Sequence, residues 1–138
     1  MEIKCLIGVG PIRFGMSPDE VRVTLGAEFE SFKRTPASDY LCDHFHELGC
    51  FVYYDGERLV EAVELAEPAK PTLDGINLLS ASFKNVIENI KRIDPDVSAE
   101  SDGFTSLRLG LGGWAPSAED EPDDALKSIV VFSEGYYD

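Results

Sequence analysis

The stretch Cys50-Phe-Val-Tyr-Tyr-Asp-Gly-Glu-Arg-Leu-Val-Glu-Ala-Val-Glu-Leu65 contains two runs rich in β-branched and aromatic residues, separated by Asp55-Gly56. Such residues favour strands, and Asp-Gly readily adopts the positive φ angles of a two-residue hairpin turn. We therefore predict an antiparallel hairpin with one strand over residues 50–54 and its partner over residues 58–65.

Two segments elsewhere in the chain carry the signals of helices. Ser17-Pro-Asp-Glu20 places a capping serine, a proline at the first helical position and a glutamate at the third, and Gly26 then provides a stop. A second helix is predicted from about Ser82 to Ile93, where an apolar stripe ends before Asp94-Pro95.

The second helix is followed by another strand-rich block, predicted over residues 104–111 and 128–133, with an acidic loop at residues 116–124. Runs of strands without intervening helices favour antiparallel pairing. We therefore predict an α+β fold, an antiparallel sheet with two helices packed on one face, in a single domain of residues 1–138. A shift of 65 residues aligns the two helix stripes, which predicts two helix-plus-strands repeats, residues 1–67 and 72–138.

The residues Phe14-Gly-Met-Ser-Pro-Asp-Glu-Val21, followed by Leu25-Gly26, resemble the helix-opening motif of the outer-membrane lipoprotein family typified by BamE. Two such units in tandem are similar to the β-lactamase-inhibitor-protein fold. The resemblance implies helix-plus-strands units. This sequence departs from the lipoproteins in showing neither a signal nor a lipidation cysteine, so the resemblance implies no location or activity.

The formal net charge is −14 at pH 7, and acidic residues concentrate in two blocks: residues 39–67 carry a net charge of −7 and residues 94–138 a net charge of −9. Such charge disfavours nucleic-acid backbones and anionic membranes as partners. No apolar run is long enough for a membrane span, and no secretory signal is recognisable. Three cysteines at uneven spacing indicate reduced thiols rather than a disulfide framework, so we expect a cytoplasmic protein.

The stretch Leu41-Cys-Asp-His-Phe-His-Glu-Leu-Gly-Cys50 holds both histidines and two of the three cysteines. In an extended strand Cys42, His44 and His46 share one face, so they are candidate zinc or copper ligands. A structural zinc site needs four ligands, and no second cluster in the sequence completes the set. The favoured interpretation is that Phe45 packs inward while the histidines lie on an outer face. A small metal-binding or metal-sensing protein is the alternative.

No motif in the sequence indicates catalysis or a bound cofactor. Cys42 or Cys50 could act as a nucleophile beside a histidine, but residues two apart on one strand point in parallel and rarely form an oriented donor chain. The glycine-rich stretches Gly8-Val-Gly10 and Gly110-Leu-Gly-Gly-Trp114 deliver no phosphate to a helix N-terminus. We interpret these glycines as strand bulges or turns.

The acidic run Glu119-Asp-Glu-Pro-Asp-Asp124 follows the only tryptophan, Trp114. Aromatic residues ringed by charge are typical of binding surfaces. We therefore expect a non-catalytic protein that binds a basic protein partner, most concretely an immunity protein that neutralises a cationic toxin. A small-ligand site formed by Tyr53, Tyr54 and Trp114 is a third hypothesis. The predicted partner-binding residues are Glu119, Asp120, Glu121, Asp123, Asp124, Asp43, Glu47 and Trp114.

Overall fold

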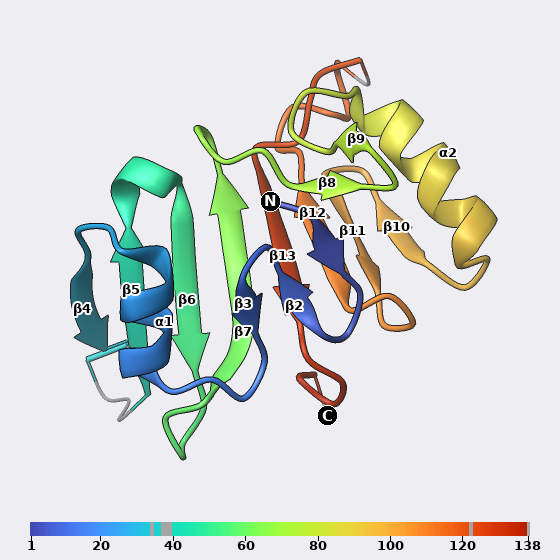
Figure 1. Ribbon diagram of the computed structural model, residues 1–138. Helices are drawn as coiled ribbons and strands as arrows, with labels where there is room; N and C mark the ends of the chain where they lie inside the picture. The colour runs from blue at the N-terminus through green and yellow to red at the C-terminus, as the bar shows by residue number, and fades with distance from the viewer. Residues whose placement is uncertain (34, 37–39, 122, 138) are drawn as a thin grey trace.

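A computed structural model describes residues 1–33, 35, 36, 40–121 and 123–137, and one eight-stranded sheet dominates it (Figure 1). The elements of the first half are β1 (Ile3–Lys4), β2 (Gly8–Val9), β3 (Ile12–Arg13), α1 (Pro18–Leu25), β4 (Glu30–Lys33), β5 (Leu41–Phe45), the 3-10 turn η1 (His46–Leu48), β6 (Cys50–Tyr54) and β7 (Val60–Ala66). Those of the second half are β8 (Thr72–Leu73), β9 (Ile76–Asn77), α2 (Phe83–Ile93), β10 (Ser98–Glu100), β11 (Gly103–Ser106), β12 (Leu111–Trp114) and β13 (Ser128–Phe132).

The strands of the large sheet follow the order β10-β11-β12-β13-β7-β6-β5-β4, and every neighbouring pair is antiparallel. Each helix is therefore followed by four consecutive strands that pair as a meander. The last strands of the two meanders, β7 and β13, pair with each other at the centre of the sheet. This is the predicted α+β fold. The repeat of the sequence itself stays a prediction, although the element order of the two halves matches it.

Both helices begin and end where local chemistry predicts. Ser17 and Glu20 form a reciprocal capping box at the start of α1, and Gly26 ends that helix in the left-handed region with φ of 57°. The Ser82 hydroxyl accepts a hydrogen bond from the backbone N–H of Asn85 at 3.2 Å and so caps α2. Of the helices in the described residues, none is long and apolar enough to cross a membrane.

The two helices lie on the same face of the large sheet, which we call the covered face (Figure 1). Side chains alternate along each strand, and the inward set on the central strands is fully buried. Burying one such aliphatic side chain contributes about 2 kcal/mol. The core joins the central strands to α1, α2 and β1–β3 through Val52, Val63, Leu65, Leu111, Ile129, Val131, Val21, Phe83, Val86, Ile90, Val9 and Ile12.

Several predicted boundaries are wrong. The connection between β6 and β7 spans residues 55–59 instead of two, with Arg58 at φ of 63° and a bulge at Tyr53 and Tyr54. The run 104–111 forms β11 and part of β12 rather than one strand. The chain reverses before Gly110, whose φ is 63° and whose missing Cβ would collide with the carbonyl oxygen of Phe132. The edge strands β4 and β10 were not predicted, because their exposed residues show no apolar alternation.

A buried carboxylate attaches α1 to the sheet. Asp43 on β5 is fully buried and accepts hydrogen bonds from Arg22 Nε at 2.9 Å and Arg22 Nη2 at 3.0 Å. It also accepts one from the Tyr54 hydroxyl at 2.8 Å and one from the Ser31 hydroxyl. The prediction of Asp43 as a residue that contacts a partner is therefore wrong, because its strand position points the carboxylate under α1.

The same contacts set the protonation of Asp43. Burial works to raise the pKa of its carboxyl group, but the hydrogen bonds from Arg22, Ser31 and Tyr54 outweigh burial and hold the pKa below its ordinary value. An aspartate whose pKa is lower in the folded than in the unfolded protein stabilises the fold, and this contribution is complete when the pH is above the unfolded-state pKa of about 4. That contribution is lost as the pH falls through the folded-state pKa.

We expect Asp43→Asn to lower the free energy of unfolding at pH 7 by about 3 kcal/mol, because Arg22 loses its buried counter-charge. The deficit relative to the wild type should be constant between pH 5 and pH 8 and should shrink below pH 4. Urea unfolding at several pH values measures it. Asp120→Asn, at an exposed position, is the matched control and should change stability little. A deficit that stays constant down to pH 2 would contradict this role for Asp43.

Candidate functional site

The opposite face of the large sheet carries neither helix, and we call it the open face. Residues paired directly across neighbouring strands share a face, so the registers identify its side chains. They are Glu30 and Phe32 on β4, Cys42 and His44 on β5, Phe51 and Tyr53 on β6, Ala62, Glu64 and Ala66 on β7, Ser128, Val130 and Phe132 on β13, Gly112 and Trp114 on β12, Gly103 and Thr105 on β11, and Ser98 and Glu100 on β10.

Aromatic rings form a band along the open face. On one side of the band, the His44 ring lies parallel to Phe51 with centroids 3.9 Å apart, and Phe32 meets Phe51 edge-on at 6.5 Å. On the other, Tyr137 packs edge-on against Phe132 with centroids 5.0 Å apart. Trp114 is 51% exposed. Large apolar side chains left in solvent on a sheet face are characteristic of binding surfaces.

A hydrogen bond near the middle of the open face fixes Glu64. The Tyr53 hydroxyl donates to Glu64 Oε1 at 2.7 Å from the neighbouring strand. Burial, with the bond to Glu64, raises the pKa of Tyr53 well above its ordinary range, so its hydroxyl remains a donor at physiological pH. Glu64 is thereby held as an oriented acceptor between aromatic side chains.

Beside Glu64 lies a depression of about 190 Å³, which we call the central hollow. Glycine at position 112, opposite Val130 and Thr105 in the registers, contributes no side chain to its floor. The lining includes Glu64, Thr105, Gly112, Trp114, Val130 and Tyr137. A carboxylate therefore stands in the same small hollow as two exposed aromatic rings.

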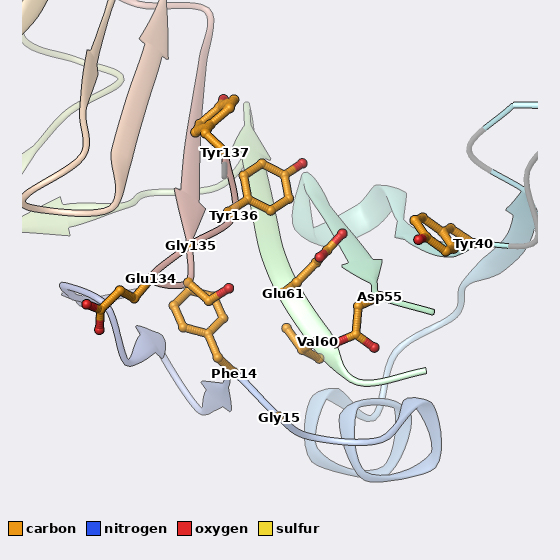
Figure 2. Close-up of a pocket in the computed structure, with 11 residues that line it drawn as sticks. Phe14, Gly15, Tyr40, Asp55, Val60, Glu61, Glu134, Gly135, Tyr136 and Tyr137 are labelled. Atoms are coloured by element: carbon orange, nitrogen blue, oxygen red, sulfur yellow. The ribbon is translucent and has the colours of Figure 1, made fainter. Parts of the chain in front are cut away.

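A larger pocket of about 810 Å³, the terminal pocket, lies where β7 begins and β13 ends (Figure 2). Backbone hydrogen bonds from Gly15 to Val60 and from Ser133 to Glu61, both 2.9 Å long, join the segments that line it. Figure 2 shows Glu61 and Asp55 between Tyr136 and Tyr40. Tyr137 lines both the terminal pocket and the central hollow, so the two are neighbours.

The acidic loop predicted to bind a partner lies at the opposite end of β13 from the terminal pocket. Glu119, Asp120, Glu121 and Asp123 are exposed and Asp124 is half-buried. A hydrogen bond with Asp124, together with repulsion from its carboxylate, raises the pKa of Glu121. The backbone N–H of Lys127 donates to the carbonyl oxygen of Trp114 at 2.8 Å, and the backbone N–H of Phe83 donates to the carbonyl oxygen of Asp124 at 2.7 Å, so the end of the loop is anchored at the start of α2.

Glu47, the remaining acidic residue of the predicted set, is exposed in η1. The turn η1 joins β5 to β6, so Glu47 lies at the same end of the sheet as the acidic loop, which joins β12 to β13. The two connections are three strand spacings, or roughly 15 Å, apart. The structure thus anchors the acidic loop at the start of α2, directs the Trp114 side chain to the open face, places Glu47 apart along the same end, and buries Asp43.

The histidine- and cysteine-containing stretch does not form a recognisable metal centre. Phe45 is fully buried, as the favoured interpretation required, while His44 and His46 have ring centroids 6.1 Å apart. Cys42 is fully buried, and burial raises the pKa of the Cys50 thiol to about 12. In the part of the chain that the structure describes, no group of three or more His, Cys, Asp and Glu residues is placed to hold a metal ion.

Most of the open face was not predicted from the sequence as a binding site. Tyr53 and Trp114 were predicted as binding residues, but Phe51, Glu64 and Tyr137 were not. The signal was present in the quoted stretch, because Phe51, Tyr53 and Glu64 alternate with buried residues along β6 and β7. Tyr54, the other tyrosine of the small-ligand hypothesis, points to the covered face and bonds Asp43.

Comparisons with models of protein families, with curated proteins and with solved structures find no match for this chain. The resemblance to BamE-like units therefore stays a prediction, and the function is inferred from the geometry of the open face.

We expect acrylamide to quench the fluorescence of Trp114 with a constant about half that of the unfolded chain, because 51% of this side chain is exposed. The tryptophan is unique, so it alone contributes to the signal when the excitation wavelength lies beyond the absorption band of the tyrosines. Tyr137→Ala should raise the constant, since the two side chains line the same hollow. Quenching typical of a core tryptophan would show that β12 does not present Trp114 to solvent.

Proposed function

We propose that this protein binds a basic protein partner on the open face of its sheet and acts through that binding. The observation that carries the proposal is the composition of the face. The strand residues that form it, all of them described, include three glutamates and six aromatic or imidazole side chains, of which only Phe132 is buried, but neither lysine nor arginine. A surface of this kind favours a partner that offers positive charge and apolar contact together.

The aromatic residues supply the affinity in this proposal. Interface energy concentrates in a few large side chains near the centre of the contact, where Trp and Tyr are enriched. Trp114 and Tyr137 are 51% and 58% exposed and adjoin the same hollow, so both have area left to bury. Eight strands spaced about 4.8 Å apart make a face roughly 34 Å wide, enough for the breadth of an ordinary protein interface.

The charge supplies attraction at a distance. The net charge of −14 gives the whole molecule a negative field. The acidic loop and the carboxylates of the terminal pocket lie at opposite ends of β13, so negative charge lies at both ends of the sheet. Such a field accelerates encounter with a cationic protein by one or more orders of magnitude and disfavours acidic competitors.

An inhibitor of a cationic enzyme is the most specific form of this proposal. An immunity protein that neutralises a basic toxin would use the same physics, because surface carboxylates can occupy the positions of nucleic-acid phosphates on a basic active-site cleft. The charge of the partner and the surface that it contacts are therefore the two properties to measure.

We expect a protein captured on the immobilised chain from a lysate of the source cells to have a high isoelectric point. Its association rate constant should fall at least about tenfold between 0.05 and 0.5 M NaCl, because screening weakens long-range attraction. Surface plasmon resonance at several salt concentrations measures the rate. A captured protein whose association ignores salt, or whose net charge is negative, would contradict the proposal.

We expect Trp114→Ala to weaken this complex by about 30-fold, the typical effect of removing an aromatic residue from the centre of an interface. Val23→Ala is the matched control, because Val23 is 83% exposed on α1, which packs on the covered face. Its dissociation constant should equal that of the wild type. Loss of binding in Val23→Ala with none in Trp114→Ala would place the interface on the helix side and overturn the proposal.

A further inference from the structure

The central hollow combines three features that recognise one particular kind of group. Gly112 adds no side chain to the floor of the hollow, Glu64 contributes a carboxylate to its lining, and the rings of Trp114 and Tyr137 border it. None of the side chains that line the hollow, all of which the structure describes, is basic. A cation entering the hollow would therefore meet a counter-charge and aromatic rings without a competing positive group.

We propose that the central hollow receives the guanidinium group of an arginine from the basic partner. This inference rests on the proposed function and names the contact at the centre of that interface. A planar guanidinium stacks on aromatic rings and donates paired hydrogen bonds to a carboxylate, so it can use Trp114 and Glu64 at once. A lysine ammonium carries the same charge but lacks the planar, paired donors.

The orientation of Glu64 supports this choice of ligand. Tyr53 donates to Oε1 at 2.7 Å, which holds the carboxylate in one position from the neighbouring strand. An acceptor that is already fixed loses less side-chain freedom when a ligand binds, and arginine gains most from a fixed planar acceptor. A volume of about 190 Å³ suits the end of one side chain rather than a folded segment or a drug-sized ligand.

The hollow is also placed for access by a partner. Trp114 and Tyr137 are both more than half exposed, so its rim is open. Glu64 lies on β7, one of the two central strands of the sheet, away from either edge. An arginine inserted there would be surrounded by the rest of the open face, the position in which interface residues contribute most to affinity.

The intrinsic fluorescence of Trp114 provides a direct test. We expect a blocked glycyl-arginyl-glycine tripeptide to change this fluorescence saturably and to bind at least about fivefold more tightly than the same peptide with citrulline, the neutral isostere of arginine. The lysine peptide should fall between the two. Glu64→Gln keeps an oxygen that can accept from Tyr53 but removes the charge, and it should lower the affinity for the arginine peptide by about fivefold.

Glu88→Gln is the matched control, because Glu88 is an exposed carboxylate on α2, on the covered face, and lines neither the central hollow nor the terminal pocket. It should leave the arginine affinity unchanged, and unfolding curves should show that both variants fold. Equal binding of the arginine and citrulline peptides, or equal losses in the two variants, would overturn the inference. A basic partner that binds the open face equally well to wild type and Glu64→Gln would overturn it too while leaving the proposed function intact.

If the arginine peptide behaves as expected but no basic protein binds the open face, the proposed function fails and the guanidinium site stands. The peptide titration and the partner titration therefore separate the two claims, since each has a result that contradicts one without the other.

Discussion

The antiparallel pairing of β7 with β13 is the contact on which the rest of the structure depends, because it joins two four-stranded meanders into one sheet. Alternation along these two strands then divides the molecule. Val63 opposite Val131 points under the helices and belongs to the core, whereas Glu64 opposite Val130 points to the open face. A register shift of one residue would exchange the two sets, burying a carboxylate and exposing the core. Fold and candidate site therefore share one physical cause.

The two faces handle negative charge in opposite ways. On the covered face, Asp43 is completely buried and four donor groups, all of them from outside its own strand, satisfy it, so its charge serves stability. On the open face, Glu64 accepts a hydrogen bond from the Tyr53 hydroxyl and borders a hollow beside solvent-exposed rings. A carboxylate surrounded by donors is saturated, and one held by a neutral hydroxyl retains its charge for another molecule. The face on which a carboxylate lies thus distinguishes structural carboxylates from candidate binding carboxylates. The sequence alone could not make this distinction, because acidic residues are abundant in it.

Local signals predicted the class of the fold and both helices, because capping at Ser17 and Ser82 and the stops after residues 25 and 93 are encoded by neighbouring residues. The alternating stretch 50–65 likewise predicted β6 and β7. The edge strands β4 and β10 were not predicted, because their exposed residues lack apolar alternation. The turn before Gly110 was not predicted, because the two short strands on either side of it look like one continuous strand in the sequence. Asp43 was misassigned because its partner Arg22 lies 21 residues away in sequence. The central hollow could not be predicted from the sequence, because β7, β12 and the C-terminal tyrosines come together only in the folded protein.

The central claim is that the open face is the surface that meets a basic partner. Hydroxyl-radical footprinting of the complex with that partner, read by mass spectrometry, tests it most directly, because exposed aromatic and aliphatic side chains react with the radical. Trp114 and Tyr137 report on the open face, and Val23 and Ile93 report on the helices. Protection of Trp114, Tyr137 and Phe51, with α1 and α2 as reactive as in the free protein, is the result we expect. Protection confined to the helices, with Trp114 unchanged, would contradict it.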